Sequence, residues 1–432
     1  MELPSNLMMI SGLLTFDRMP DVEHLSAIFE HRLCRYERFR CQVVEPALGL
    51  GLPSWQLDHD FRVENHLRVE KLDKPLMERV GELMSEPLDR SRPLWEFRLF
   101  PNVDGGAALL GRLHHAIGDG IALMRVLLNL GDSQREAPWP EATPQEVQRE
   151  PREGPFEKAK RVANQLLHEG HDLLFHPSQA SQLARQGLQA SQALARLVSL
   201  SPDQESVFRG PLQNRKVAAV SPPLELAPIK ALGKRLGCTI NDILMGTLAG
   251  GLGRSLARWQ SVPSDLQIRA VVPVDLRAGQ ADHLGNHFGL VFLELPVGEP
   301  HPGRRLQKVR QNMQNLKESA EAVVAFELLS AVGMVPAEIE KWVIQWFGNK
   351  ATAVVTNLPG PRERLYLAGA RVDSVMYWVP QSGRLGLGVS VLSYADQVRV
   401  GIASDAELIP HPEYLVEDFL VSYQELAQLE AL

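Results

Sequence analysis

Two adjacent histidines, followed four residues later by an aspartate, are the residues of this chain best suited to chemistry. They lie in the segment RLHHAIGDG, which contains His114, His115, Asp119 and Gly120. An apolar strand is expected to end at the histidines, and a turn and an apolar helix follow. Because side chains alternate along a strand, only one of the two imidazoles can point into a given cleft. A histidine held in this way could act as a general base.

Structural roles for the same residues remain open. Asp119 precedes an apolar helix and could serve only as its N-cap, and the glycines could be ordinary turn residues. Zinc binding is less favoured, because adjacent residues rarely bind one metal and the sequence has no HExxH pattern. The GxSxG, GxxxxGK[ST] and GxGxxG patterns are also missing from the sequence. Their absence weakens serine hydrolysis, phosphoryl transfer and dinucleotide redox chemistry as interpretations.

Composition narrows the class of protein. The chain has 432 residues, of which 44% are hydrophobic, and 45 Lys and Arg face 52 Asp and Glu, for a formal net charge of −7. A chain of this length can bury a core without disulfides, and its acidic balance argues against a general nucleic-acid binder. Its three cysteines fit a reducing cytoplasm and exclude a disulfide framework. Neither an apolar stretch of membrane-spanning length nor a secretory signal is recognised in the sequence.

Hydrophobic periodicity predicts helices and strands in both halves of the chain. The expected strands are Leu7–Phe16, Ala107–Leu113, Gln267–Val274, Gly289–Leu295, Ala351–Thr356, Gly386–Leu392 and Gln397–Ile402. The expected helices are Val22–Leu33 with Asp21 as its N-cap, Leu76–Met84, Ile121–Leu130, Pro228–Leu236, Asn241–Leu256, Arg304–Glu321 and Pro410–Leu432. This pattern therefore favours two α+β lobes of about 200 residues each over one large domain.

The expected division of the chain has three parts. Residues 1–134 form an N-terminal lobe that carries HHAIGDG, and residues 209–432 form a C-terminal lobe. Between them, residues 135–208 begin with a proline-rich linker and continue as a helical bridge that Pro177 divides. A slight excess of basic residues over Arg152–Leu200 leaves contact with a membrane surface as an alternative role for the bridge.

Further segments carry a resemblance to a known family. HHAIGDG matches the HHxxxDG signature of acyltransferases with a chloramphenicol acetyltransferase-like fold. Other segments, in order, are PLDRSRPLWEFRL, TINDILMGTLAGGL, RAVVPVDLR with LGN, VTNLPGP and LSY. With HHAIGDG they span about residues 5 to 405, and together they resemble the bacterial wax ester synthase/diacylglycerol acyltransferase family. In that family a helix usually precedes the segment that matches Glu2–Ile10, where this chain begins.

The resemblance implies both a fold and an activity. The fold would be α+β, with two chloramphenicol acetyltransferase-like lobes joined by the helical linker and an active site in a tunnel between them. The activity would be transfer of a long-chain fatty acyl group from acyl-CoA to a diacylglycerol or long-chain alcohol, giving triacylglycerol or wax ester plus free CoA. Acyl-CoA would be a co-substrate, and no cofactor or metal is implied. The alternatives are a condensation-type acyltransferase served by a carrier protein, and a non-catalytic lipid-binding relative.

The resemblance also assigns roles around the histidines. His115 would be the general base, and His114 would support the loop. Asp119 would turn away from the cleft and pair with an arginine, for which Arg277 is the candidate. Gly120 would permit a close approach that a β-carbon would block.

Other segments supply the remaining candidate residues. Asn241 would stabilise the oxyanion, although it could instead be the N-cap of the helix that follows. Asn357 and Gly360 would shape the lobe interface, and Pro93 and Trp95 would line or brace the tunnel.

Contact with CoA phosphates is a minor expectation for the basic residues Arg304, Arg305, Lys308 and Arg310, since such a cluster is usually a solvated helix face. The partners expected are acyl-CoA, a lipid alcohol and a lipid surface, without nucleic acid. The expected location is the cytoplasm, with peripheral attachment to the inner face of the membrane or to lipid inclusions.

Overall fold

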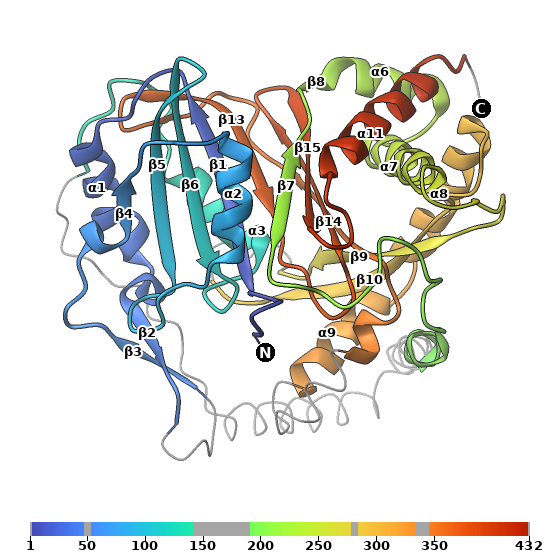
Figure 1. Ribbon diagram of the computed structural model, residues 1–432, viewed down its shortest axis with the longest axis horizontal. Helices are drawn as coiled ribbons and strands as arrows, with labels where there is room; N and C mark the ends of the chain where they lie inside the picture. The colour runs from blue at the N-terminus through green and yellow to red at the C-terminus, as the bar shows by residue number, and fades with distance from the viewer. Residues whose placement is uncertain (1, 47–52, 141–190, 278–283, 333–344, 431–432) are drawn as a thin grey trace, which may run out of the picture.

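Two mixed β-sheets, each with its own helices, build the protein (Figure 1). The computed structural model describes residues 2–46, 53–140, 191–277, 284–332 and 345–430. Each sheet has its own buried apolar cluster. The expected fold class is therefore confirmed: two sheet-rich lobes in which helices and strands mix.

The six-stranded sheet holds the first lobe together, in the order β12-β13-β1-β6-β5-β4. Its strands are β1 (Met9–Phe16), β4 (Leu67–Val69), β5 (Trp95–Val103), β6 (Gly106–His114), β12 (Tyr366–Leu367) and β13 (Ala370–Trp378). Its helices are α1 (Val22–His31), α2 (Leu76–Ser85) and α3 (Gly120–Asn129). The spacing expected for α1 is confirmed, because Leu25, Ile28 and Phe29 share one buried face and Asp21 caps its start.

The larger sheet has seven strands and belongs to the second lobe, in the order β10-β9-β11-β14-β15-β7, with β8 beside β15. The strands are β7 (Lys216–Val220), β8 (Leu224–Glu225), β9 (Ile268–Asp275), β10 (Phe288–Leu295), β11 (Ala353–Pro359), β14 (Leu387–Tyr394) and β15 (Gln397–Asp405). The helices are α6 (Leu226–Leu236), α7 (Ile240–Ala257), α8 (Pro302–Lys317), α9 (Glu321–Val332) and α11 (Pro412–Ala427). A short hairpin, β2 (Cys41–Val44) with β3 (Ser54–Leu57), stands apart from both sheets.

Helix α7 is buried nearly all round, which explains its run of apolar, glycine and alanine residues. A β-carbon on Gly253 would lie 2.1 Å from the carbonyl oxygen of Val297, so the residue type there is fixed by close packing. Gly237 follows α6 with φ of 63° and ends that helix, which agrees with the end predicted at Leu236.

The sheets do not divide the chain at the boundary expected from sequence, and this is a correction. Strand β13, far along the chain, pairs with β1 in the first lobe, where Ser11 lies opposite Trp378. Helix α2, from the first part, packs in turn on β7 of the second sheet, where the Lys216 N–H donates to Ser85 Oγ at 2.8 Å. Because β13 fills the place beside β1, the ranges 1–134 and 209–432 are not separate structural units. Residues 141–190 of the expected linker lie outside the described residues, and residues 191–199 are helical.

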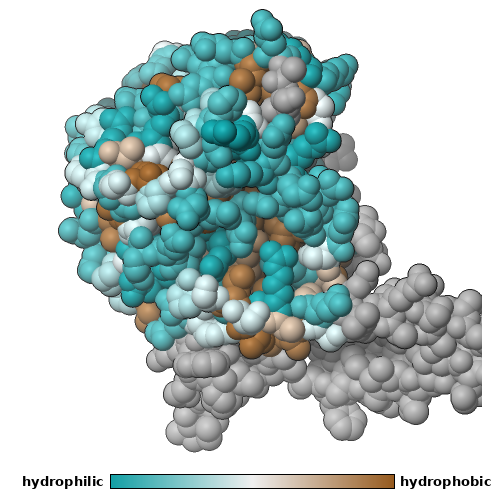
Figure 2. All heavy atoms as spheres, turned by 90° about the vertical axis from the view of Figure 1, so that its right-hand side faces the viewer, coloured by the Kyte–Doolittle hydropathy of each residue, from teal (hydrophilic) through white to brown (hydrophobic). Residues whose placement is uncertain are grey.

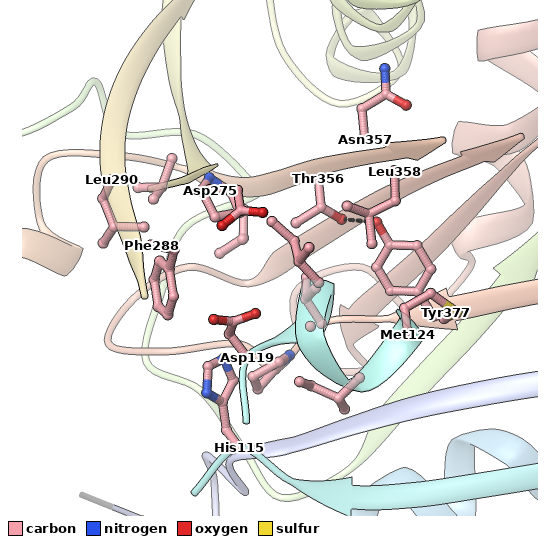
Figure 3. A pocket seen from close by; sticks show the side chains of 18 of the residues that line it. His115, Asp119, Met124, Asp275, Phe288, Leu290, Thr356, Asn357, Leu358 and Tyr377 are labelled. Carbon is pink, nitrogen blue, oxygen red and sulfur yellow. Dashed lines mark hydrogen bonds between the residues drawn. The ribbon is translucent and has the colours of Figure 1, made fainter. Parts of the chain in front are cut away.

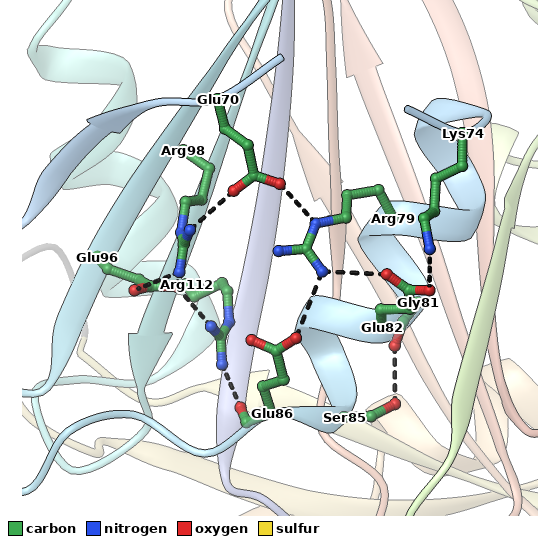
Figure 4. Close-up of polar contacts among 10 residues, drawn as sticks. All are labelled: Glu70, Lys74, Arg79, Gly81, Glu82, Ser85, Glu86, Glu96, Arg98 and Arg112. Carbon is green, nitrogen blue, oxygen red and sulfur yellow. Dashed lines mark hydrogen bonds and ion pairs between the residues drawn. The ribbon is translucent and has the colours of Figure 1, made fainter. Parts of the chain in front are cut away.

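Helix α2 meets the first sheet through charged side chains (Figure 4). Glu70 accepts from Arg79 at 2.7 Å and from Arg98 at 2.8 Å. Arg112 of β6 is almost wholly buried, pairs with Glu96 and donates to the backbone at the end of α2. Removing one member of such a buried pair leaves an isolated charge. The network therefore fixes α2 against the strand that ends at the histidine pair.

Most predicted elements are present with ends shifted by a few residues, but some were not predicted. Strands β5, β7 and β13 are the main omissions, and β13 supplies part of the lobe junction. The helix expected over Arg304–Glu321 ends at Lys317, and Glu321 begins α9 instead. No helix among the described residues is long and apolar enough to cross a membrane.

Candidate active site

A cavity of about 540 Å³ lies between the two sheets, and both lobes contribute its walls (Figure 3). The first lobe provides residues of β1, β13 and α3, and the second provides residues of β9, β10 and β11. Most of these side chains are apolar. Examples are Ile10, Met124, Leu128, Val271, Phe288, Leu290 and Leu358. The space therefore suits an apolar ligand with few polar groups.

His115 stands at the wall of this cavity, one residue beyond the end of β6 (Figure 3). Its N–H donates to the carbonyl oxygen of Met8 at 2.7 Å, and its own carbonyl oxygen accepts from Asn286 Nδ2 at 3.3 Å. Its ring faces Phe288, with 5.8 Å between the ring centroids. The two groups that hydrogen-bond to the His115 backbone come from different lobes. The position of His115 therefore depends on how the lobes meet.

The environment of His115 favours its neutral form. Burial lowers the pKa of His115 from its ordinary value, although the negative charge of Asp119 acts in the opposite direction. A neutral imidazole has the free electron pair that a general base needs.

His114 points elsewhere, as strand alternation predicts, and does not line the cavity. Its Nδ1 accepts from the Ala116 N–H at 3.1 Å, and its Nε2 lies 3.6 Å from Glu2 Oε2. The neighbouring His114 is the main influence that lowers the pKa of Glu2 to about 2, and Arg90 lowers it further. His114 thus contacts the loop and the start of the chain, in keeping with the supporting role expected for it.

Asp119 joins the two lobes. Its Oδ1 accepts from the Ala122 N–H at 2.9 Å and caps α3. Its Oδ2 accepts from Arg277 Nη2 and from the His287 N–H at 3.1 Å. Arg277 also donates to the carbonyl oxygen of Gly285 at 2.8 Å. The aspartate is therefore both a helix cap and one half of a buried ion pair, and the arginine is the one that the sequence suggested. Asp119 also lines the cavity (Figure 3), so the expectation that it lies away from the cleft was wrong.

The expectation for Gly120 was wrong in its physical reason. A β-carbon there would lie 3.8 Å from Ile10 Cδ1, which is ordinary van der Waals contact. Gly120 lines the cavity, so the missing side chain leaves space for a ligand. The close approach occurs at Gly360, where a β-carbon would lie 2.4 Å from the carbonyl oxygen of Ser393.

Asn241 is not placed beside His115. It is the second residue of α7 and lines another cavity, of about 350 Å³. The alternative role as N-cap was wrong, because Thr239 caps the helix in a capping box with Asp242. Asn241 Oδ1 instead accepts from Asn357 Nδ2 at 2.9 Å. Asn357 lines both cavities, which fits the interface role expected for it.

Pro93 and Trp95 lie in the core of the first lobe and do not line the cavity at His115. Trp95 is 1% exposed, and its Nε1 donates to the carbonyl oxygen of Phe39 at 2.8 Å. Its ring stacks on His66, with 4.3 Å between centroids. The sequence led us to expect that these residues either line the tunnel or brace it. Their positions in the structure allow only the bracing role.

Sequence reasoning missed several polar residues of the cavity. Tyr377 of β13 donates to Thr356 Oγ1 of β11 at 2.8 Å, across the lobe junction (Figure 3). Burial is the main cause that raises the pKa of Tyr377, so it remains a neutral hydroxyl. Arg125 of α3 lies 3.3 Å from Asp275 of β9, also across the junction. The apolar and aromatic run near the end of β13 was a usable signal for that strand.

The basic cluster on α8 is largely neutralised. Arg304 and Lys308 lie 3.2 Å and 2.9 Å from oxygens of Glu299. Arg305 is buried, and one of its nitrogens lies 3.5 Å from Glu425 Oε2. These three cations therefore pair within the second lobe, and the buried Arg305 departs from the solvated helix face that was expected.

A two-lobed fold with an HHxxxDG segment at the interlobe cavity defines the class: an acyltransferase with a chloramphenicol acetyltransferase-like fold. Residues 1–244 match the wax ester synthase/diacylglycerol acyltransferase catalytic domain, and residues 284–427 match the WS/DGAT C-terminal domain. The chain therefore belongs to the wax ester synthase/diacylglycerol acyltransferase family.

Relatives of known name agree with this membership. O-acyltransferase WSD of Acinetobacter baylyi is 27% identical over 385 residues, covering 84% of this chain and 80% of its own. The probable diacylglycerol O-acyltransferase tgs1 of Mycobacterium tuberculosis is 27% identical over 405 residues, covering 90% of this chain and 84% of its own.

Solved structures share the fold. The wax ester synthase/diacylglycerol acyltransferase of Marinobacter aquaeolei aligns with a TM-score of 0.67 at 22% identity, covering 99% of this chain and 97% of its own. The first condensation domain of the calcium-dependent antibiotic synthetase aligns with a TM-score of 0.62 at 16% identity, covering 99% of this chain and 92% of its own. At these identities the likeness concerns the fold alone. Among the described residues, no cluster of His, Cys, Asp and Glu suited to a metal ion occurs.

Proposed function

We propose that this O-acyltransferase moves a long-chain fatty acyl group from acyl-CoA to a diacylglycerol or long-chain alcohol, with His115 as general base. The observation that carries the proposal is the position of His115 at the wall of a largely apolar cavity of about 540 Å³. Fatty acyl and alkyl chains suit such walls, because burying apolar surface stabilises the complex by about 25 cal/mol per Å².

The reaction needs one group that moves a proton in both directions. An alkanol is too weak an acid to be ionised beforehand, so His115 takes the hydroxyl proton while the oxygen attacks the thioester carbon. The tetrahedral intermediate then breaks its carbon–sulfur bond, and the protonated imidazole returns the proton to the departing CoA sulfur. Such acid–base assistance contributes about 10²–10⁴-fold in rate.

Asp119 and Arg277 support the role of His115 as general base without taking part in the reaction. Their ion pair links the start of α3 to the loop after β9, and Gly285 of the same loop accepts from both residues. The contact keeps the two walls of the cavity together around His115. We assign both residues to positioning.

We also propose peripheral association with the inner face of a membrane or with lipid inclusions, since the lipids made are insoluble in water. Exposed apolar side chains support this on the helix of residues 191–199, where Leu194 and Val198 stand, and on α9, where Val323 is 53% exposed. Leu197 and Ala325 of these two helices belong to one buried apolar cluster. Figure 2 views the molecule from the right-hand side of Figure 1 and shows apolar side chains gathered in the lower part of that face.

Release of free CoA thiol tests the function directly. The purified chain is given palmitoyl-CoA with hexadecanol or with a diacylglycerol, and reactions without acceptor measure hydrolysis. We expect thiol release that depends on the acceptor, together with ester product. No release above hydrolysis with any lipid alcohol would contradict the function, whereas full turnover by His115→Ala would contradict only the assigned base.

A further inference from the structure

We propose that the second cavity, of about 350 Å³, binds the phosphate-bearing end of acyl-CoA through Lys230 and Arg362. This inference rests on the proposed use of acyl-CoA. It assigns a location to the part of the donor that does not react.

The two cavities adjoin at the end of β11. Asn357 and Pro359 line both of them. Within the first cavity, β11 contributes residues from Val354 to Pro359, a length of about 17 Å at about 3.3 Å a residue. The second cavity continues along the chain with Gly360, Pro361 and Arg362. A long ligand could therefore follow β11 from one cavity into the next.

The charges of the second cavity suit a polyanion. Lys230 of α6 is half-buried, Arg362 is exposed, and neither has an ion-pair partner within the described parts of the chain. Asp396 is the acidic residue among those that line the cavity. Ammonium and guanidinium groups are the side chains that bind phosphate most strongly in proteins.

Other features nearby do not supply this charge. Arg304, Arg305 and Lys308 of α8 are paired with Glu299 or Glu425, and no basic residue of α8 is among those that line the cavity. The start of α7 also borders the cavity, but two of its terminal groups are engaged by Thr239 and Asp242 in the capping box. Attraction for an anion therefore comes from the two side chains.

The chemistry of the donor requires such a second site. Acyl-CoA carries its thioester at one end of a flexible pantetheine arm and its phosphate groups at the other. The thioester must reach His115 in an apolar cavity, and phosphates there would lose their hydration without cationic partners, which is costly. Placing them beside Lys230 and Arg362 resolves this conflict.

Kinetics with two donors test the assignment. Lys230→Ala and Arg362→Ala are compared with Lys234→Ala, which removes an exposed charge from the same helix away from the cavity. Because each variant loses one charge-assisted contact, we expect it to raise KM for palmitoyl-CoA about tenfold, which corresponds to about 1.4 kcal/mol. The palmitoyl thioester of N-acetylcysteamine lacks phosphates, so its KM and kcat should stay unchanged. Equal KM values for palmitoyl-CoA in all three variants would overturn the proposal.

Direct binding separates this inference from the proposed function. Titration calorimetry with CoA alone needs no turnover, and both cavity variants should weaken binding about tenfold while Lys234→Ala does not. This result with no acyl transfer would uphold the site and reject the function. Transfer with unchanged CoA binding would reject the site and keep the function. Inorganic phosphate should bind far more weakly than CoA, and equal affinity would overturn the assignment in favour of a simple anion site.

Discussion

His115 is subject to two opposing influences, burial and the charge of Asp119. Burial is the larger of the two, and it lowers the pKa of His115 below its ordinary value. The neutral form therefore persists to lower pH than for a histidine in water, whose pKa is about 6.5.

This gives a prediction for the pH dependence of the reaction. The base works only when unprotonated, so kcat/KM should stay constant near neutral pH and fall only below pH about 6.5. The profile of kcat/KM against pH, measured with palmitoyl-CoA and a lipid alcohol, checks this. An acid limb centred above that value would contradict it. His115→Ala should lose about 10²–10⁴-fold in kcat and lose the limb, with its circular dichroism spectrum unchanged.

The ion pair between Asp119 and Arg277 is the second feature at the scale of residues. Their side chains are only 3% and 4% exposed. Asp119→Asn would keep a good helix cap but remove one of two carboxylate partners of the buried guanidinium, which keeps Asp275 Oδ1 at 3.2 Å, so we expect a loss of about 2 kcal/mol in the free energy of unfolding. Urea unfolding measures this loss. Arg125→Ala breaks the exposed pair with Asp275 and should cost at most about 1 kcal/mol; equal losses in the two variants would refute the distinction.

The end of strand β11 decides the shape of both cavities at the scale of elements. The Gly360 N–H donates to the carbonyl oxygen of Ser393 at 2.8 Å, and this contact leaves no room for a β-carbon. Parallel pairing with β14 extends to Pro359, so the strand and the loop after it are held together.

A pair of glycine substitutions tests this packing. Gly360→Ala should destabilise the protein by about 1–3 kcal/mol, since a β-carbon forces the backbone of β14 to shift. Gly120→Ala should change stability by less than about 1 kcal/mol, because its β-carbon meets only ordinary contacts. Thermal unfolding of both variants supplies the measurement. If Gly120→Ala were the more damaging change, the close approach would be misplaced.

The exchange of elements between lobes matters at the scale of the whole molecule. Strand β13 completes the first sheet although it follows strands of the second, and α2 returns the contact by packing on β7. If either lobe unfolds, the other loses elements that pack against it.

We therefore expect one cooperative unfolding transition. Differential scanning calorimetry should give a calorimetric enthalpy equal to the van't Hoff enthalpy, provided that unfolding is reversible. Two resolved transitions would show that the lobes unfold independently. Asp119→Asn should lower the temperature of the single transition without splitting it, because the ion pair is only one of several links.

Short-range sequence patterns determined the individual helices and strands and the segment that carries His115. The periodicity of α1, the glycine that ends α6 and the strand–turn–helix around His115 all follow from contacts within a few residues. The opposite directions of His114 and His115 follow from alternation along the strand.

Only the tertiary structure decided which distant segments meet. The placement of β13 beside β1, the role of Tyr377 and the separation of Asn241 from His115 depend on long-range pairing. The pairing of Asp119 with Arg277 could be suggested from the family resemblance, but its burial could not. The physical reason is that pairing between remote strands and the packing of whole faces are set by the burial of all the elements together, which no local pattern records.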